Sequence, residues 1–264
     1  MSKKIKLFTI LVVLTSLLCA AQSFAQSGKP VTLKADTIVY DSTTGVSTAE
    51  GNVVIIQEDG QATASRAEYN MNTQVGWLEG GVVATKGDAT LTANRVWIRN
   101  SNHITAEGSA TFSKAGDSIS ATALDYWSDR QFAQTSGGWA RLNQKDGSVL
   151  TAQYIEYDMQ KGLAIAERNV EINSPARNLT GAGDKATYTV GTNGQPGEIV
   201  LSGNAWLIQD GNKIVGNSLI VKSDSSSSAA KGNVRMDIPP KSQQEKEQPI
   251  EESTQQDTKP VEKE

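Results

Sequence analysis

The chain has 264 residues but only one histidine, one cysteine and seven prolines, and these shortages exclude several classes of protein. A zinc site needs about three or four ligands, usually including several histidines or cysteines. A Ser–His or Cys–His nucleophile pair would have to use His103. The chain contains no P-loop, no G-x-G-x-x-G after a strand and no H-E-x-x-H motif. We therefore expect no enzymatic activity, no cofactor and no metal.

Positive charge is also scarce. The net charge is −4 and the isoelectric point is about 5.2, so the basic surface typical of nucleic-acid-binding proteins is missing. Proline is rare outside the last residues, whereas glycine occurs 23 times. This composition favours β-structure over a helical bundle.

The first 25 residues have the pattern of a secretory signal peptide. A lysine-rich start precedes the apolar run Leu7–Leu18, and Ser23-Phe24-Ala25 forms a small-x-small cleavage site. We expect cleavage near Ala25 and export of the mature chain. Cys19 would be removed with the signal, which leaves no disulfide. An uncleaved anchor is the alternative, although the apolar run is short for a membrane span.

The last 26 residues differ in composition from the rest of the chain. Residues 239–264 contain four of the seven prolines, many charged residues and almost no apolar side chain. Such a segment buries too little apolar surface to offset its conformational entropy, so we expect a disordered acidic tail. The predicted organisation is a signal at 1–25, one domain at 26–238 and a tail at 239–264.

The predicted domain is built from two interleaved repeats. The first has the order apolar, x, small, x, x, apolar, x, large apolar, and it occurs seven times at steps of 28 to 33 residues. Its last members are Tyr40, Tyr69, Ile98, Tyr126, Tyr157, Tyr188 and Val221. The second repeat is Glu-Gly-x-apolar-x-apolar or a looser version of it, with its glycine at Gly51, Gly80, Gly108, Gly137, Gly203 and Gly232.

Two copies of the second repeat are irregular. Arg168 replaces the glycine in the fifth copy. In the fourth copy, Trp139 and Arg141 occupy the positions where two inward-facing apolar residues are expected. We therefore expect these two copies to line the trough less regularly than the others.

The spacing of these residues predicts bent strands. Side chains on a strand alternate between faces, so Leu33 and Ala35 share one face, as do Ile38 and Tyr40. The step of three from Ala35 to Ile38 breaks the alternation once, which a bulge or bend accommodates while both halves keep facing one interior. Turn signals recur about every 14 residues, which favours two antiparallel strands per repeat. We expect a folded sheet whose two arms enclose an apolar trough. A parallel β-helix with one coil per repeat is the rival fold.

The sequence resembles the OstA-like (LptA) family of lipopolysaccharide transport proteins. The resemblance depends on A-D-x-I-x-Y-D-x-x-T-G at 35–45 and on A-E-G-N-V-x-I at 49–55, and the same pattern continues to Ile238. It implies an all-β fold, a V-shaped semi-open antiparallel β-jellyroll built of about seven two-strand repeats.

The resemblance also implies a function in outer membrane assembly. Proteins of this family carry lipopolysaccharide across the periplasm, with its acyl chains in the trough and protomers stacked head to tail. The expected partners are lipopolysaccharide or a related glycolipid, further OstA-like components at the inner and outer membranes, and other copies of the chain. A membrane-anchored or outer-membrane component of the same export system is the first alternative. A secreted β-helical enzyme or adhesin is the second, although the acidic residues are scattered.

The residues predicted to line the lipid-binding trough are the inward-facing members of both repeats. They are Leu33, Ile38, Tyr40, Val53, Ile55, Leu91, Val96, Ile98, Phe112, Leu124, Tyr126, Leu150, Ile155 and Tyr157. Basic residues near the mouth, such as Arg66, Arg95 and Arg99, are candidates for phosphate contacts. We expect His103 to lie in an exposed polar turn and the five tryptophans to pack on the outer faces.

Overall fold

The computed structural model describes residues 31–57, 59–100, 102–127, 129–158, 160–189, 197–222 and 228–239. The predicted signal and almost all of the predicted tail lie outside these residues. Within them the chain forms seventeen strands and one 3-10 turn. The strands are β1 (Thr32–Lys34), β2 (Thr37–Asp41), β3 (Val46–Gln57), β4 (Gly60–Asn70), β5 (Val75–Lys86), β6 (Ala89–Asn100), β7 (His103–Lys114), β8 (Asp117–Trp127), β9 (Phe132–Asn143), β10 (Val149–Ala152), β11 (Tyr154–Asp158), β12 (Leu163–Ser174), β13 (Leu179–Thr189), β14 (Glu198–Gln209), β15 (Asn212–Lys222), β16 (Ser228–Lys231) and β17 (Arg235–Asp237). The 3-10 turn, η1, spans Pro175–Arg177.

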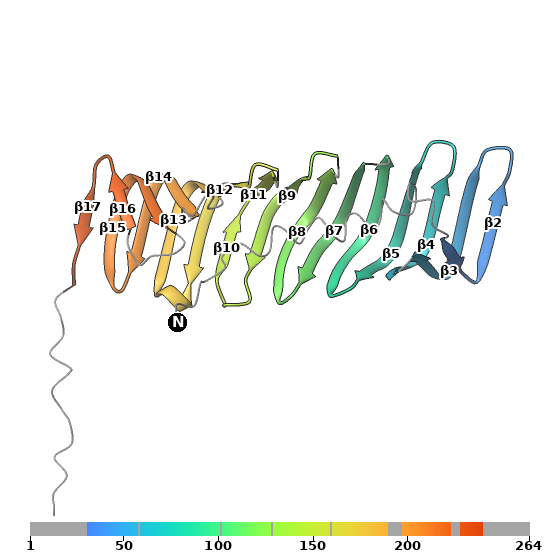
Figure 1. Ribbon diagram of the computed structural model, residues 1–264, viewed down its shortest axis with the longest axis horizontal. Helices are drawn as coiled ribbons and strands as arrows, with labels where there is room; N and C mark the ends of the chain where they lie inside the picture. Colours follow the sequence, from blue (N-terminus) through green and yellow to red (C-terminus); the bar gives the residue numbers. More distant parts are fainter. Residues whose placement is uncertain are drawn as a thin grey trace, which may run out of the picture.

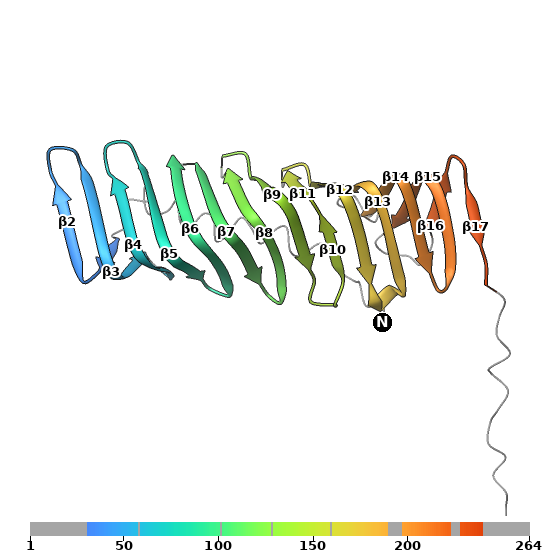
Figure 2. The ribbon, with the colours of Figure 1, turned by 180° about the vertical axis from the view of Figure 1, so that it is seen from behind.

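The strands stack in chain order along one long axis (Figures 1 and 2). Each long strand pairs antiparallel with the strand before it and the strand after it. Three pairs of short segments each serve as one interrupted strand: β1 and β2 both pair with β3, β10 and β11 with β9 and β12, and β16 and β17 with β15. This confirms the all-β antiparallel fold and excludes a parallel β-helix.

Each second strand bends where the Glu-Gly repeat was found. At each of seven such corners two consecutive residues have positive φ, which is rare for residues other than glycine. The pairs are Gly51-Asn52, Gly80-Gly81, Gly108-Ser109, Gly137-Gly138, Arg168-Asn169, Gly203-Asn204 and Gly232-Asn233. Arg168, with φ of 67°, adopts the same conformation as the glycines it replaces.

A polar residue of the preceding strand lies against most of these corners. Ser65 donates a hydrogen bond from Oγ to the carbonyl oxygen of Gly80 at 2.9 Å, and Thr122 bonds Gly137 in the same way at 3.2 Å. The side chain of Asn94 lies beside Gly108. The first glycine of each of these corners therefore faces a neighbour that leaves no room for a Cβ atom.

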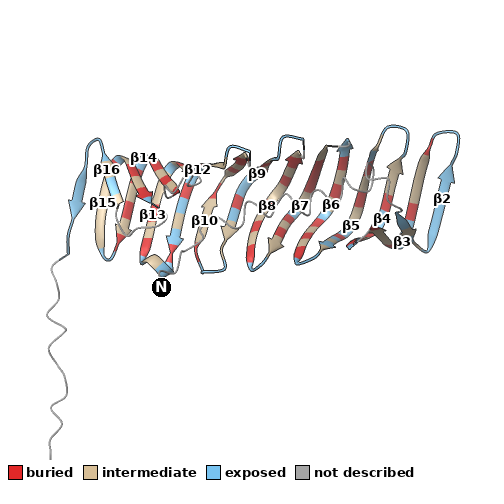
Figure 3. Ribbon diagram, in the orientation of Figure 1, coloured by how far each residue is buried: buried red, intermediate tan, exposed pale blue. Residues whose placement is uncertain are grey.

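The bend lets both halves of a strand bury the same face. In β7, Ile104 and Ala106 are buried before the corner, and Ala110 and Phe112 are buried after it. Figure 3 shows the resulting stripes of buried residues along β4–β9 and β12–β15. These inward side chains form one apolar core that runs along the molecule. The predicted pattern of inward positions is therefore correct for most copies.

The fourth copy of the second repeat was wrongly predicted. Its corner contains one extra residue, because three residues separate Ser136 from Ala140 on β9 whereas only Thr122 separates their partners on β8. The extra residue moves Trp139 outward, where it is 47% exposed, and Arg141 is also exposed. Ala140 is the buried inward residue instead.

Replacing a corner glycine tests the role of the close approach. In Gly80→Ala, the new Cβ would lie 2.5 Å from Cβ of Ser65, whereas a Cβ at Gly81 would meet nothing within 4 Å. Both substitutions place alanine at positive φ, which costs about 1–2 kcal/mol. We expect Gly80→Ala to lower the free energy of unfolding by at least about 1 kcal/mol more than Gly81→Ala. Urea unfolding measures both, and equal losses would show that the contact with Ser65 is unimportant.

Candidate functional site: two apolar hollows between the arms

The larger hollow lies at the N-terminal end of the molecule and has a volume of about 450 Å³. Side chains from the β1–β6 region line it, and most of them are apolar. Five predicted trough residues are among them: Leu33, Ile55, Leu91, Val96 and Ile98. Glu68 is the only charged residue among the described residues that line this hollow.

The smaller hollow lies in the C-terminal half and has a volume of about 100 Å³. Leu150 and Ile155, both predicted, line it together with Leu201 and Val221. Its few polar residues include Ser148 and Ser174, whose hydroxyl groups are hydrogen-bonded to each other at 2.8 Å. A site of this kind favours an apolar ligand with a small polar part.

Between the two hollows the interior is tightly packed. Phe112 on β7 is 1% exposed, and Tyr126 on β8 is also 1% exposed. Leu124 is buried beside them, and no residue of β7 or β8 lines either hollow. The apolar interior is therefore divided, in this conformation, by a packed central section formed by β7 and β8.

The remaining predicted trough residues lie in two other places. Val53 and Tyr157 are buried in the interior without lining either hollow. Ile38 and Tyr40 lie on the edge strand β2, where they are 46% and 55% exposed. Their cross-strand partners on β3 are Ala49 and Ser47, which both line the N-terminal hollow. Ile38 and Tyr40 thus extend the inner face of the sheet from the N-terminal hollow to the edge strand β2.

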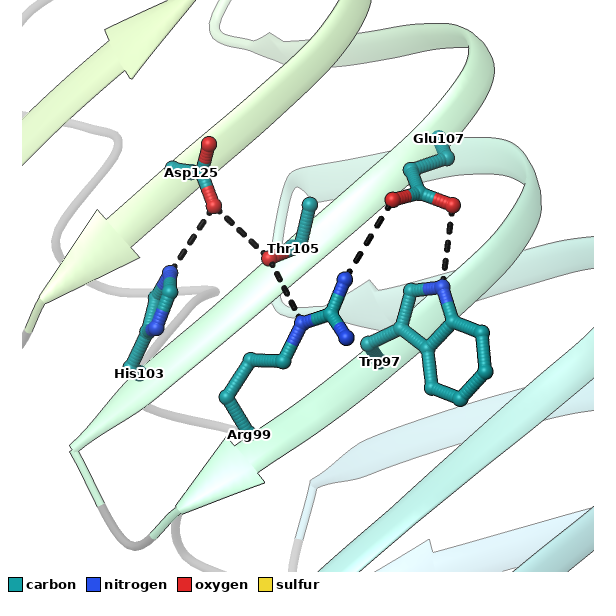
Figure 4. Close-up of polar contacts among 6 residues, drawn as sticks. All are labelled: Trp97, Arg99, His103, Thr105, Glu107 and Asp125. Atoms are coloured by element: carbon teal, nitrogen blue, oxygen red, sulfur yellow. Dashed lines mark hydrogen bonds and ion pairs between the residues drawn. The ribbon is translucent and has the colours of Figure 1, made fainter.

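The outer face carries a polar and aromatic network on β6, β7 and β8 (Figure 4). The indole nitrogen of Trp97 donates to Glu107 at 2.9 Å, and Arg99 forms an ion pair with the same carboxylate at 3.4 Å. The guanidinium groups of Arg95 and Arg99 lie over the Trp97 ring at 5.0 and 4.7 Å. Arg95 and Arg99 therefore lie on the outer face and line neither of the two hollows, and their contact with phosphate stays a prediction.

His103 is not an exposed turn residue as predicted. It begins β7, and its imidazole lies 2.8 Å from a carboxylate oxygen of Asp125, which also accepts a hydrogen bond from Thr105 at 2.7 Å. The ring stacks on Trp127 with 4.3 Å between centroids. The single histidine is therefore part of the outer-face network.

Two inward tyrosines have strongly perturbed ionisation. Burial, together with the smaller effects of the neighbouring Tyr188 and Asp158, raises the pKa of Tyr157 to about 12. Burial also raises the pKa of Tyr188, which lines the C-terminal hollow, to about 12. Both phenols remain neutral in the folded protein at a pH where an unfolded chain would already release their protons.

Alkaline pH should therefore destabilise the C-terminal half. An unfolded tyrosine ionises near pH 10, so the stability that these two phenols contribute is present below pH 10 and is lost as the pH rises toward about 12. We expect the free energy of unfolding to fall less steeply over this range in Tyr157→Phe than in the unaltered chain. Tyr40→Phe, at an exposed position, serves as the control, and identical slopes for all three proteins would contradict the assignment.

One residue of the C-terminal hollow was missed by the sequence analysis. Arg177, in η1, lines the hollow and donates a hydrogen bond to the carbonyl oxygen of Lys222 at 2.9 Å. It lies in a turn outside both repeats, so no periodic signal marks it. Only the three-dimensional packing brings it to the apolar interior.

The described ranges contain no cluster of three or more potential metal ligands among histidine, cysteine and carboxylate side chains. No helix among these residues is long and apolar enough to span a membrane.

Residues 61–163, which include all of β5–β11, match the family described as LptA/(LptD N-terminal domain) LPS transport protein. This match confirms the predicted resemblance over these residues. No curated protein matches the sequence significantly.

Among solved structures, the chain is similar to LptH from Pseudomonas aeruginosa. That protein is described as the LptA homologous periplasmic component of the conserved lipopolysaccharide transport device. The sequences are 14% identical, and the similarity covers 82% of this chain and 99% of that chain, with a TM-score of 0.16. At this TM-score the likeness carries no argument of its own.

Proposed function

Because residues 61–163 match the family described as LptA/(LptD N-terminal domain) LPS transport protein, we propose that this protein carries lipopolysaccharide through the periplasm. Its acyl chains would lie between the two arms of the bent sheet. The observation that supports the proposal most strongly is the apolar N-terminal hollow of about 450 Å³. It lies at the end of the sheet that β2 forms, where no further strand covers the interior. The signal-like residues 1–25 support export of the chain.

Burial of acyl chains would supply most of the affinity. Each methylene group removed from water contributes about 0.8 kcal/mol. The apolar side chains that line both hollows present little polar surface for competing hydration. A carrier of this kind needs no chemical step, which agrees with the lack of a catalytic constellation in the sequence.

Passage along the molecule would require movement of the packed central section. Phe112 and Tyr126 fill the interior between the hollows, so an acyl chain passes β7 and β8 only if the arms separate there. The two hollows would then act as successive positions for acyl chains. Association of the lipid with the N-terminal hollow would precede this opening.

Site-specific photocrosslinking tests where acyl chains bind. A photoreactive side chain at Ile38 or Ile55 should capture glycolipid, because Ile55 lines the N-terminal hollow and Ile38 lies on the same inner face. The adjacent positions Thr37 and Val54 point to the outer face and serve as controls. We expect several-fold more lipid adduct at the two isoleucines, measured by mass spectrometry after purification from a glycolipid-containing envelope. Equal capture at all four positions would exclude a directed trough.

The two ends of the sheet could pair with each other in a second copy. β2 pairs only with β3, and β17 only with β15, so each end presents an edge. Apolar side chains are exposed at both ends, among them Val39 and Tyr40 at one and Met236 and Ile238 at the other. Because the edges differ, such a contact would be heterologous and could continue into a filament. The residues after Ile238 are acidic and rich in proline, so they are suited to limiting this growth.

Sedimentation velocity tests this stacking. Deletion of residues 240–264 should raise the mean oligomer size at a given protein concentration, because it removes the charged, proline-rich residues that follow β17 in the sequence. Met236→Lys in the shortened chain should lower the size again, since a charge on an edge opposes pairing. Val83→Lys, at an exposed position in the middle of the sheet, is the control and should not change it. If the full-length and shortened chains are both monomers at every concentration, stacking does not occur.

A further inference from the structure

We propose that the packed central section opens by movement of only one of the two arms. This inference rests on the proposed lipid-carrying function and concerns how an acyl chain would pass between the two hollows. The arms meet at the corners, so β6, β7 and β8 each contribute one half to each arm. The upper arm, named from its place in Figure 1, contains residues 95–100, 103–107 and 123–127, and the lower arm contains residues 89–93, 110–114 and 117–121.

Each arm contributes one large side chain to the central section. Tyr126 belongs to the upper arm, because its partner Ile104 lies before the corner at Gly108. Phe112 belongs to the lower arm, because it lies after that corner and pairs with Ile119. Phe112 and Tyr126 are each 1% exposed. An acyl chain can therefore pass only if one of the two side chains moves away from the other.

Hydrogen bonds on the outer face hold the upper arm behind Tyr126. Asp125, the preceding residue, lies 2.8 Å from the imidazole of His103 and accepts a hydrogen bond from Thr105 at 2.7 Å. Thr105 in turn accepts a bond from Arg99 at 3.3 Å, so these contacts run from β8 across β7 to β6 (Figure 4). Although it lies on the outer face, Thr105 is only 6% exposed, because the surrounding side chains cover it. Displacement of Tyr126 would pull Asp125 away from these partners.

Aromatic contacts extend this outer-face network to β9. The Trp127 ring stacks on His103 with 4.3 Å between centroids and lies 5.7 Å from the ring of Phe132. The guanidinium group of Arg130 lies over the Trp127 ring at 4.6 Å. Side-chain contacts therefore connect four consecutive strands of the upper arm, from β6 to β9, in addition to the backbone ladder.

The outer face of the lower arm carries only small side chains on the same three strands. Thr92, Thr111 and Ser120 lie in cross-strand register, and the hydroxyl groups of Thr111 and Ser120 are hydrogen-bonded at 3.0 Å. Such short side chains reach no farther than the adjacent strand. Movement of the lower arm, which carries Phe112, therefore breaks fewer side-chain contacts than movement of the upper arm. The outward residues of the lower arm are Thr90, Thr92, Thr111, Ser113, Ser118 and Ser120.

Amide hydrogen exchange on the full chain, measured by mass spectrometry without a ligand, tests this difference. We expect amides in residues 110–114 and 117–121 to exchange at least about tenfold faster than those in 103–107 and 123–127, because the lower arm opens more easily. Both sets belong to β7 and β8, so their distance from the ends of the sheet is the same. Equal rates, or faster exchange in the upper arm, would overturn the inference.

Two threonine variants on β7 test whether the outer-face network is the cause. Thr105→Val removes the hydroxyl that joins Asp125 and Arg99, and Thr111→Val removes the one that is bonded to Ser120. We expect Thr105→Val to raise exchange in the upper arm at least about fivefold, and Thr111→Val to leave the upper arm unchanged. Asp125→Asn, which keeps the shape of the side chain, should act like Thr105→Val. If neither upper-arm variant raises this exchange, the network does not hold the arm and the inference fails.

A lipid probe separates failure of this inference from failure of the proposed function. The probe is palmitate that carries a diazirine group, and its adducts are mapped by mass spectrometry after illumination. We expect adducts on residues that line the two hollows, and a further rise in exchange confined to the lower arm of β7 and β8. Adducts in the hollows with equal changes in both arms would exclude one-arm opening and leave the lipid-carrying function intact. Absence of adducts from both hollows would contradict the lipid-carrying function, whereas the difference between the arms measured without a ligand would stand.

Discussion

The bend in every second strand is the constraint on which the rest of the structure depends. Side chains on a straight strand point alternately to its two faces, so only every second side chain can be buried in one interior. Here a pair of residues with positive φ interrupts one strand of each neighbouring pair, and both halves then bury apolar side chains on the same side. The corner glycines accept this conformation and the close approach of residues such as Ser65 and Asn94. Without the bends the apolar stripes would not face each other across the interior.

This constraint explains which features the sequence predicts well. Ala93 and Val96 are three residues apart and both buried, so the break in alternation was visible as a spacing. Glycine at Gly80 or Gly108 marked the corners because few other residues adopt positive φ. Arg168 replaces the glycine in the fifth copy, so the sequence marked this copy as irregular, yet the structure places a corner there as in the other copies.

Other features depend on information that a periodic pattern does not contain. One extra residue at the fourth corner shifted Trp139 and Arg141 outward, and an insertion of one residue reverses every face assignment after it. His103 was placed in a turn because its neighbours are polar, but its partner Asp125 is 22 residues away. The division of the interior into two hollows follows from the size of side chains such as Phe112 and Tyr126 meeting across the arms. The contact of Arg177 with Lys222 joins segments that share no repeat position.

The stacking of strands in chain order has a mechanical consequence. Apart from a few contacts such as the one made by Arg177, each strand is held mainly by its immediate neighbours in the sequence, so the molecule resembles a one-dimensional array more than a globule with a single centre. In such an array the end units lose structure first, and the interior units open only after their neighbours or through a separate local event. Backbone amides of β7 and β8 would then exchange hydrogen with solvent most slowly, while those of β2 and β17 would exchange fastest. Unfolding would therefore begin at the two ends of the sheet. These are also the places where a strand of another chain could pair with the free edges of the end strands.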